Sequence, residues 1–196
     1  MTTAISNRQF EIIEAAGKIL TTSGISGLTI KNLAKEMQFS ESAIYRHFSC
    51  KEEIIIAMLN YLAESMDSRY SEIISKTQSP EEKFTILFQN QLAFFDKNPH
   101  FVVAVFSDGL LEESQRINET ILKIMQIKKK HLAPIIAEGQ QQAVFINTIP
   151  ADEIIHIIMG AFRLQMFKWR TAHFQFDIMD KGQNLIKTLL SIIKIK

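Results

Sequence analysis

Apolar residues recur at intervals of three and four along nearly the whole chain, which is the period of an α-helix. No stretch shows the sustained alternation of a strand, and only residues 143–146 resemble a short extended link. The pattern therefore predicts an all-α fold. The expected helices run from Ser6 or Asn7 to a break at 23–27, then over 30–37, 41–48, 50–76, 80–97, 99–106, 112–140 (kinked at Pro134), from 148–150 past 169, and over 177–194.

Residues 29–48 contain two short helical patterns separated by a tight turn. Thr29 and Ser40 are suited to cap the two helices. In the second pattern Ile44 and Phe48 share one face. The apolar positions of the first pattern fall at i, i+3, i+4 and i+7, and they are Ile30, Leu33, Ala34 and Met37. This pair predicts a helix-turn-helix. From periodicity alone, the alternative is a pair of amphipathic surface helices with no partner.

The second helix of this pair has a polar face of Glu41, Ser42, Tyr45 and Arg46. Short polar groups, an aromatic hydroxyl and a guanidinium read base edges or bind phosphates when a recognition helix enters a major groove. The segment therefore predicts DNA binding.

A third helix is expected directly after Phe48, because Ser49 and Glu52 have the spacing of a capping box. Lys51 then lies in its first turn, where the cation and the free amides together suit a phosphate. Residues 79–82, Ser-Pro-Glu-Glu, carry a second strong start signal of the same kind.

The residues of this segment resemble the N-terminal signature of the TetR family of bacterial transcriptional regulators. The resemblance covers about the first third of the chain. It implies an all-helical homodimer that binds a palindromic operator and releases it when a small ligand enters the C-terminal domain. The matching residues are Gly24, Thr29, Leu33, Ala34, Ser40, Ile44, Tyr45, His47, Phe48, Lys51 and Glu52.

Carried over position by position, the resemblance implies three kinds of contact with DNA. Cap groups touch phosphates, side chains beside the groove hold the backbone, and the polar face meets bases or nearby phosphates. In that order, the residues are Thr29 and Ser40; Tyr45, His47 and Lys51; and Glu41, Ser42 and Arg46. Lys31, on the polar face of the first helix, completes the candidate set.

Two residues depart from the pattern. Gln38 occupies the turn position where the family commonly has Gly, and a left-handed conformation there costs a non-Gly residue roughly 1 kcal/mol. Glu41 is repelled by phosphates unless it accepts from a cytosine amine, so it is either a specificity determinant or a solvated carboxylate at the helix start.

Composition agrees with a globular protein of one or two domains, since 46% of the 196 residues are hydrophobic. No apolar run approaches the roughly 20 residues of a membrane span, and no signal peptide is recognisable, so we expect a cytoplasmic protein without a membrane partner. The single cysteine, Cys50, is consistent with a reducing compartment. It is either a redox sensor at a helix start or a bystander.

The formal charge is only +1. Residues 1–51 hold six Lys and Arg against four Glu, a net of +2, which leaves −1 for the remainder. With so few cations per subunit, useful affinity for double-stranded DNA requires two copies, and neutral donors must supply some of the phosphate contacts.

The last two helices are predicted to form a dimer interface, because their apolar area exceeds what one neighbour covers. Gly160, Ala161 and Gly182 suit close helix crossing. The predicted interface residues are Ile158, Phe162, Leu185, Leu189 and Ile192. The alternative is a simple intramolecular core.

Aromatic and methionine side chains are frequent among the middle helices and suit an adaptable apolar pocket. We therefore expect a small hydrophobic effector and no cofactor. The candidate ligand-binding residues are Phe88, Phe95, Met125, Phe162, Met166 and Trp169. The alternative, that they form a filled core, is not distinguished by periodicity.

Enzymatic function is not predicted. The five histidines are widely separated without metal-ligand spacing, and the paired glutamates fall at helix starts, where they favour the dipole. The expected organisation is a DNA-binding domain over 1–50 and a ligand-binding and dimerisation domain over 51–196. The alternatives are a helical small-molecule-binding protein or enzyme without operator binding, and a chromosome-associated DNA-binding protein without a promoter role.

Overall fold

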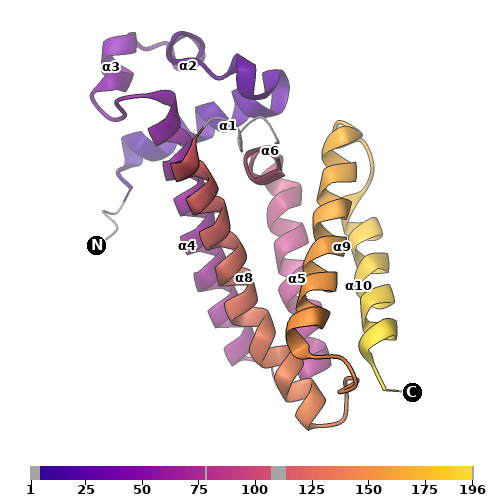
Figure 1. Ribbon diagram of the computed structural model, residues 1–196. Helices are drawn as coiled ribbons and strands as arrows, with labels where there is room; N and C mark the ends of the chain where they lie inside the picture. Colours follow the sequence, from indigo (N-terminus) through magenta and orange to yellow (C-terminus); the bar gives the residue numbers. More distant parts are fainter. Residues whose placement is uncertain (1–4, 78, 107–113, 196) are drawn as a thin grey trace. The chain divides into compact units, whose positions relative to one another are not determined.

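The computed structural model describes residues 5–77, 79–106 and 114–195, and the described part is all-α, as expected (Figure 1). It divides into two compact units, Met1–Leu62 with Pro99–Leu122 and Ala63–Asn98 with Lys123–Lys196. Helices α4 and α8 each contribute to both units. The helices are α1 (Asn7–Gly27), α2 (Ile30–Met37), α3 (Glu41–Tyr45), α4 (Lys51–Ser75), α5 (Pro80–Lys97), α6 (Pro99–Phe106), α8 (Gln115–Gln141), α9 (Ala151–Thr171) and α10 (Ile178–Ile193).

The first unit is built around α1, which packs against both α2 and α6. The buried stripe of α1 includes Ile12, Ile13, Ala16 and Leu20. The expected break at residues 23–27 is found at Gly24, whose φ of 66° lies in the region that favours glycine.

The start of α4 differs from the expected capping box. The Ser49 N–H donates to the Glu53 carboxylate at 2.9 Å, so the reciprocal contact uses Glu53 and not Glu52. The helix begins at Lys51, which makes Glu53 its third residue. The Glu52 carboxylate instead accepts a hydrogen bond from the Ser114 hydroxyl and forms an ion pair with Arg116 at 3.2 Å.

In the second unit α10 packs on α5 and on α9. The predicted start of α5 is confirmed: the Ser79 hydroxyl accepts from the Glu82 N–H, and Pro80 opens the helix. Gly182 allows the close crossing of α10 with α5, since a Cβ there would lie 2.3 Å from a methyl of Leu92. At Gly160, in contrast, an added Cβ would meet no described atom of another part of the chain within 4 Å.

The expected extended link after α8 is present as a single antiparallel bridge between Phe145 and Lys194. The Ile146 N–H donates to Ile193, and the Ile195 N–H donates to Val144. This bridge ties the end of α10 to the turn that precedes α9.

Other helix boundaries follow the predictions closely, with one shortening. Helix α3 ends at Tyr45, and residues 46–48 form a turn in which the amides of His47 and Phe48 both donate to Ile44. The expected break at Asp108–Gly109 and the first residues of the helix predicted from 112 lie outside the described residues. Within the described residues, no helix has the length and apolar character needed to cross a bilayer.

Candidate DNA-binding site

Helix α2 is capped at both ends by local contacts. The Thr29 hydroxyl accepts from the Asn32 N–H at 3.1 Å, and the Asn32 side-chain amide donates to the Gly27 carbonyl at 2.8 Å. Gln38 ends the helix in the left-handed conformation, at φ 56° and ψ 40°. The turn therefore has the geometry that the family usually builds with Gly, and Gln38 adopts it with a side chain attached.

Helix α3 is short and is held in place by its buried face. The Ser40 hydroxyl accepts from the Ala43 N–H at 3.2 Å and lies 2.9 Å from the Ser42 hydroxyl. Ile44 and, after the turn, Phe48 are buried in the first unit. These contacts orient the helix so that its other face is open to solvent.

The candidate DNA-binding residues lie on one compact unit, and nearly all are exposed. Tyr45 is 51% exposed, although an aromatic side chain of this size is usually covered. Lys51 is half-buried at the start of α4. The exposed residues are Thr29, Lys31, Ser40, Glu41, Ser42, Tyr45, Arg46 and His47.

Several acidic groups of this unit are engaged within it. The Ser49 backbone and hydroxyl lower the pKa of Glu53, and Glu52 is paired with Arg116. Glu36 lies 3.7 Å from Lys18. Glu41 takes part in no hydrogen bond or ion pair with the described residues, so its carboxylate stands at the start of α3 facing water.

The candidate ligand-binding residues lie in the second unit, and five of the six are buried together. The rings of Phe88 and Phe162 are 5.4 Å apart between centroids, and those of Phe95 and Phe162 are 6.4 Å apart. Met166 and Trp169 continue the same face of α9. Met125 differs, because it is 40% exposed on α8 and does not belong to this buried cluster.

Comparison with known proteins decides the family. A model of the bacterial regulatory proteins of the tetR family matches residues 12–58, and a model described as the YsiA-like protein C-terminal region matches residues 59–192. The nucleoid occlusion factor SlmA of Shewanella pealeana (strain ATCC 700345 / ANG-SQ1) is 30% identical over 182 residues, which cover 87% of this chain and 92% of that protein.

The chain belongs to the TetR family of bacterial regulatory proteins.

Solved structures of TetR-like regulators share the whole fold. FadR of Bacillus subtilis, in complex with stearoyl-CoA, has a TM-score of 0.82 at 18% identity and covers 94% of this chain and 98% of its own. A regulator from Saccharomonospora viridis, in complex with choline, has a TM-score of 0.83 at 18% identity and covers 96% and 98%. This TetR-family protein is a DNA-binding regulator, and all nine candidate DNA-binding residues lie within the N-terminal match.

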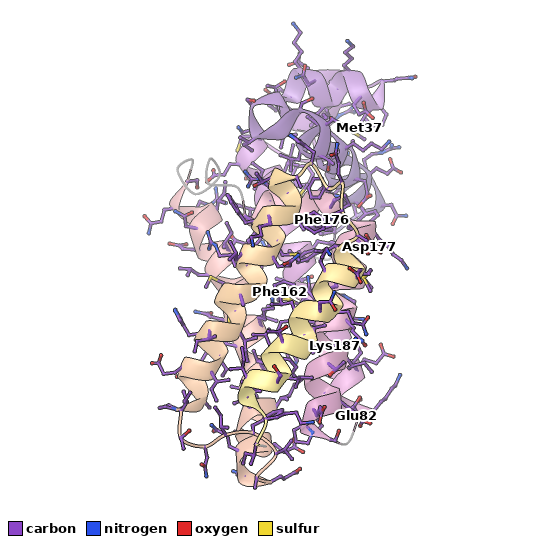
Figure 2. The ribbon with its side chains drawn as sticks, turned by 90° about the vertical axis from the view of Figure 1, so that its right-hand side faces the viewer. Met37, Glu82, Phe162, Phe176, Asp177 and Lys187 are labelled. Atoms are coloured by element: carbon purple, nitrogen blue, oxygen red, sulfur yellow. The ribbon has the colours of Figure 1, made fainter. Side chains whose placement is uncertain are left out.

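The structure buries some of the predicted dimer-interface residues of this TetR-family protein and leaves others exposed. Ile158, Phe162 and Leu189 are buried inside the chain, which corrects the expectation that they form an outer surface. Leu185 is partly covered, and Ile192 is 57% exposed. These residues are buried because α9 and α10 pack against each other and α10 also packs on α5. Figure 2 shows α9 and α10 side by side, with Phe162 labelled on α9.

The exposed apolar side chains of α9 lie on an adjacent face that sequence reasoning missed. They are Ile157, Leu164 and Phe167, and Gly160 lies among them, where an added Cβ would face open space among the described residues. These four residues are called the exposed α9 face below. Their spacing of three and four residues is the same as that of the buried face, so the pattern carries both signals. Which of the two faces is buried depends on how the helices pack.

Lys128 is a second residue that sequence reasoning missed. It is buried on α8, where it occupies an apolar position four residues after Ile124 and four before Leu132. A lysine inside an apolar helical stripe is a signal visible in the sequence, but the run of three lysines at 128–130 masks it. Lys129 and Lys130, the next two residues, are exposed.

Proposed function

We propose that this TetR-family protein is a transcriptional repressor that binds a palindromic operator as a homodimer and is released by a small hydrophobic effector. The observation that carries the proposal is the exposed polar surface of α3 and the turn after it, which bears Ser42, Tyr45 and Arg46 beside a buried Ile44. The proposed DNA-binding domain is 1–50, and the proposed ligand-binding and dimerisation domain is 51–196. We also propose that it acts in the cytoplasm and has no catalytic role.

The roles of the DNA-binding residues follow from their chemistry and exposure. Arg46 presents a fork that suits guanine or a phosphate, and Ser42 suits a base edge. Tyr45, His47 and Lys51 are placed to hold phosphates, as is Lys31 on α2. The Thr29 and Ser40 hydroxyls already accept hydrogen bonds from the Asn32 and Ala43 amides. Their proposed role is therefore to keep the N-termini of α2 and α3 open to phosphates.

The exposed α9 face supports the homodimer. Ile157 and Leu164 are each 53% exposed, and Gly160 between them leaves room for close approach of a second helix. With Leu185 and Ile192 of α10, this face is the proposed core of a bundle of two helices from each subunit. A symmetric dimer then presents two α3 helices to successive major grooves about 34 Å apart, one turn of DNA.

The effector is proposed to occupy the second unit, among Phe88, Phe95, Phe162, Met166 and Trp169. Two structurally similar regulators have been solved in complex with a small molecule, stearoyl-CoA in one and choline in the other. These ligands differ in size and charge, so the fold supports a ligand without indicating its class. Release follows if the bound ligand changes the separation of the two heads, because one head alone binds weakly.

A second candidate function is a chromosome-associated role. The observation that favours it is the 30% identity over 87% of the chain to a protein named as a nucleoid occlusion factor. The two functions differ in how many sites are bound. Mapping of bound DNA across the chromosome is expected to show a few promoter sites for the repressor, while many dispersed sites would favour the chromosomal role.

A gel shift with the DNA upstream of the chain's own gene, at two salt concentrations, tests operator binding. We expect a dimeric complex that weakens with salt, and we expect Arg46→Ala to lose about 1–3 kcal/mol of binding free energy. Lys76→Ala is the matched control, because Lys76 is an exposed cation paired with Glu72 after the end of α4. Equal binding by the wild-type protein and Arg46→Ala would contradict the proposed docking of α3.

A further inference from the structure

Lys128 of α8 places an ammonium group inside the apolar interior of the second unit. Its residue is 9% exposed, and its Nζ lies 3.5 Å from the centroid of the Phe162 ring and 5.4 Å from that of Phe88. The two rings come from α9 and α5, so three helices meet around this one nitrogen. Phe88 and Phe162 are also two of the candidate ligand-binding residues.

No anion balances this charge among the described residues. The next two lysines of α8 do have partners: Lys129 pairs with Asp152 at 3.0 Å and Lys130 with Asp67 at 2.9 Å. The Lys128 ammonium lies against two aromatic rings and pairs with no carboxylate of the described residues. Ring faces attract a cation, but they offset only part of the cost of removing it from water.

Burial has a second consequence for the same group. Desolvation lowers the pKa of Lys128 from 10.5 to about 7, and no carboxylate in the described part of the chain opposes that shift. An apolar residue at this position, like Ile124 and Leu132 on either side, would pack without this cost. A buried, unpaired charge beside an aromatic cluster is therefore better explained by a ligand than by stability.

We propose that Lys128 is the anion-recognition group of the ligand site in the second unit, and that the effector is a hydrophobic monocarboxylate whose apolar part lies against Phe88 and Phe162. This inference rests on the proposed function in one respect, namely that the second unit holds an effector. The carboxylate pairs with the ammonium, and the aromatic rings accommodate the hydrocarbon.

The charge of the site selects among anions. Within the described residues, Lys128 is the single buried cation without a carboxylate, because the other buried basic groups are His131, which contacts Asp67, and His100 of the first unit. A phosphate with two charges would remain half compensated in an apolar site, which is costly. One buried positive charge matches one carboxylate, and it repels a quaternary amine.

The protein carries its own probe for the test. Trp169 is the single tryptophan, it is buried in the second unit, and it lies seven residues after Phe162 on the same face of α9. Its fluorescence is titrated with sodium decanoate and with 4-butylbenzoate, in the absence of DNA, and the neutral compounds decanamide and decan-1-ol serve as probes without charge.

We expect saturable binding of at least one of the two acids. Decanamide and decan-1-ol, the neutral counterparts of decanoate, are expected to bind at least about tenfold more weakly than the acid. Lys128→Met is expected to weaken acid binding by a similar factor while leaving decanamide binding unchanged. Lys129→Met, which removes the exposed lysine next to it, is the matched control and should bind the acid as the wild type does. Lys128→Gln repeats the test if Lys128→Met does not fold.

Two results would overturn the inference: failure of both acids to bind, or equal acid binding by the wild type and the folded Lys128 variants. Failure of the proposed function is separate, because it is measured with operator DNA. If an acid binds through Lys128 but does not release DNA, the ligand site stands and the effector role fails. If only a neutral compound binds and releases DNA, the regulatory role stands and this inference fails.

Discussion

At the residue scale, the burial of Lys128 makes the free energy of unfolding depend on pH. Its pKa is about 7 in the folded protein and 10.5 in the unfolded chain. Between these values the unfolded state binds more protons than the folded state, so this group makes stability rise with pH over that window. Below pH 7 both states are protonated, and the folded state bears the full cost of the buried charge.

We therefore expect Lys128→Met to be more stable than the wild type near pH 6, with a difference that shrinks as the pH approaches about 9. Urea unfolding of both proteins at the two pH values checks this, because the difference between them cancels the other titrating groups. In Lys129→Met, where the lost lysine is exposed, the difference from the wild type should change little with pH. A gap between Lys128→Met and wild type that is constant with pH would show that Lys128 stays charged throughout.

The DNA-binding residues belong to this scale as well. The caps at Thr29 and Ser40 follow the sequence predictions, and Gln38 adopts the left-handed conformation whose cost for a non-Gly residue the sequence raised. These are contacts between residues two to five positions apart, so local sequence determines them. The exchange of Glu52 for Glu53 at the start of α4 shows the limit, since Ser114 and Arg116 compete for Glu52 from far along the chain.

At the element scale, the contact of α1 with α6 in the first unit depends on Gly17. A Cβ at this position would lie 2.7 Å from Cγ of the His100 ring, which is closer than non-bonded atoms approach. His100 is buried, and desolvation lowers its pKa to about 4, so the ring is neutral at pH 7. Among the described residues its Nε2 finds no hydrogen-bond partner, and the ring packs against that of Phe101 at 4.3 Å between centroids.

We expect Gly17→Ala to lower the free energy of unfolding by about 1–3 kcal/mol, although Ala favours a helix over Gly. The measurement is urea unfolding of a double-mutant cycle with His100→Ala. Removing the ring removes the clash, so the double variant should be more stable than the sum of the two single effects predicts. Simple additivity would show that the ring is not the obstacle.

At the scale of the whole molecule, the exposed α9 face governs the proposed dimer. Leu164→Glu places a charge at the centre of that face, so we expect a monomer in analytical ultracentrifugation and operator affinity at least about tenfold weaker. Met125→Glu is the control, because it charges an exposed apolar residue of the same unit on a different helix, α8. A Leu164→Glu protein that stays dimeric would require a different interface.

Helix positions and caps in this protein were determined by the sequence itself, because an apolar period and a cap are read from residues within one or two turns. The same holds for the family signature in residues 24–52. The assignment of faces was decided only by tertiary structure. Ile158 and Phe162 are covered while Ile157 and Leu164 are not, and Lys128 is enclosed while Lys129 is solvated. Adjacent residues differ in this way because burial depends on which helices pack together, and those helices are distant in the chain.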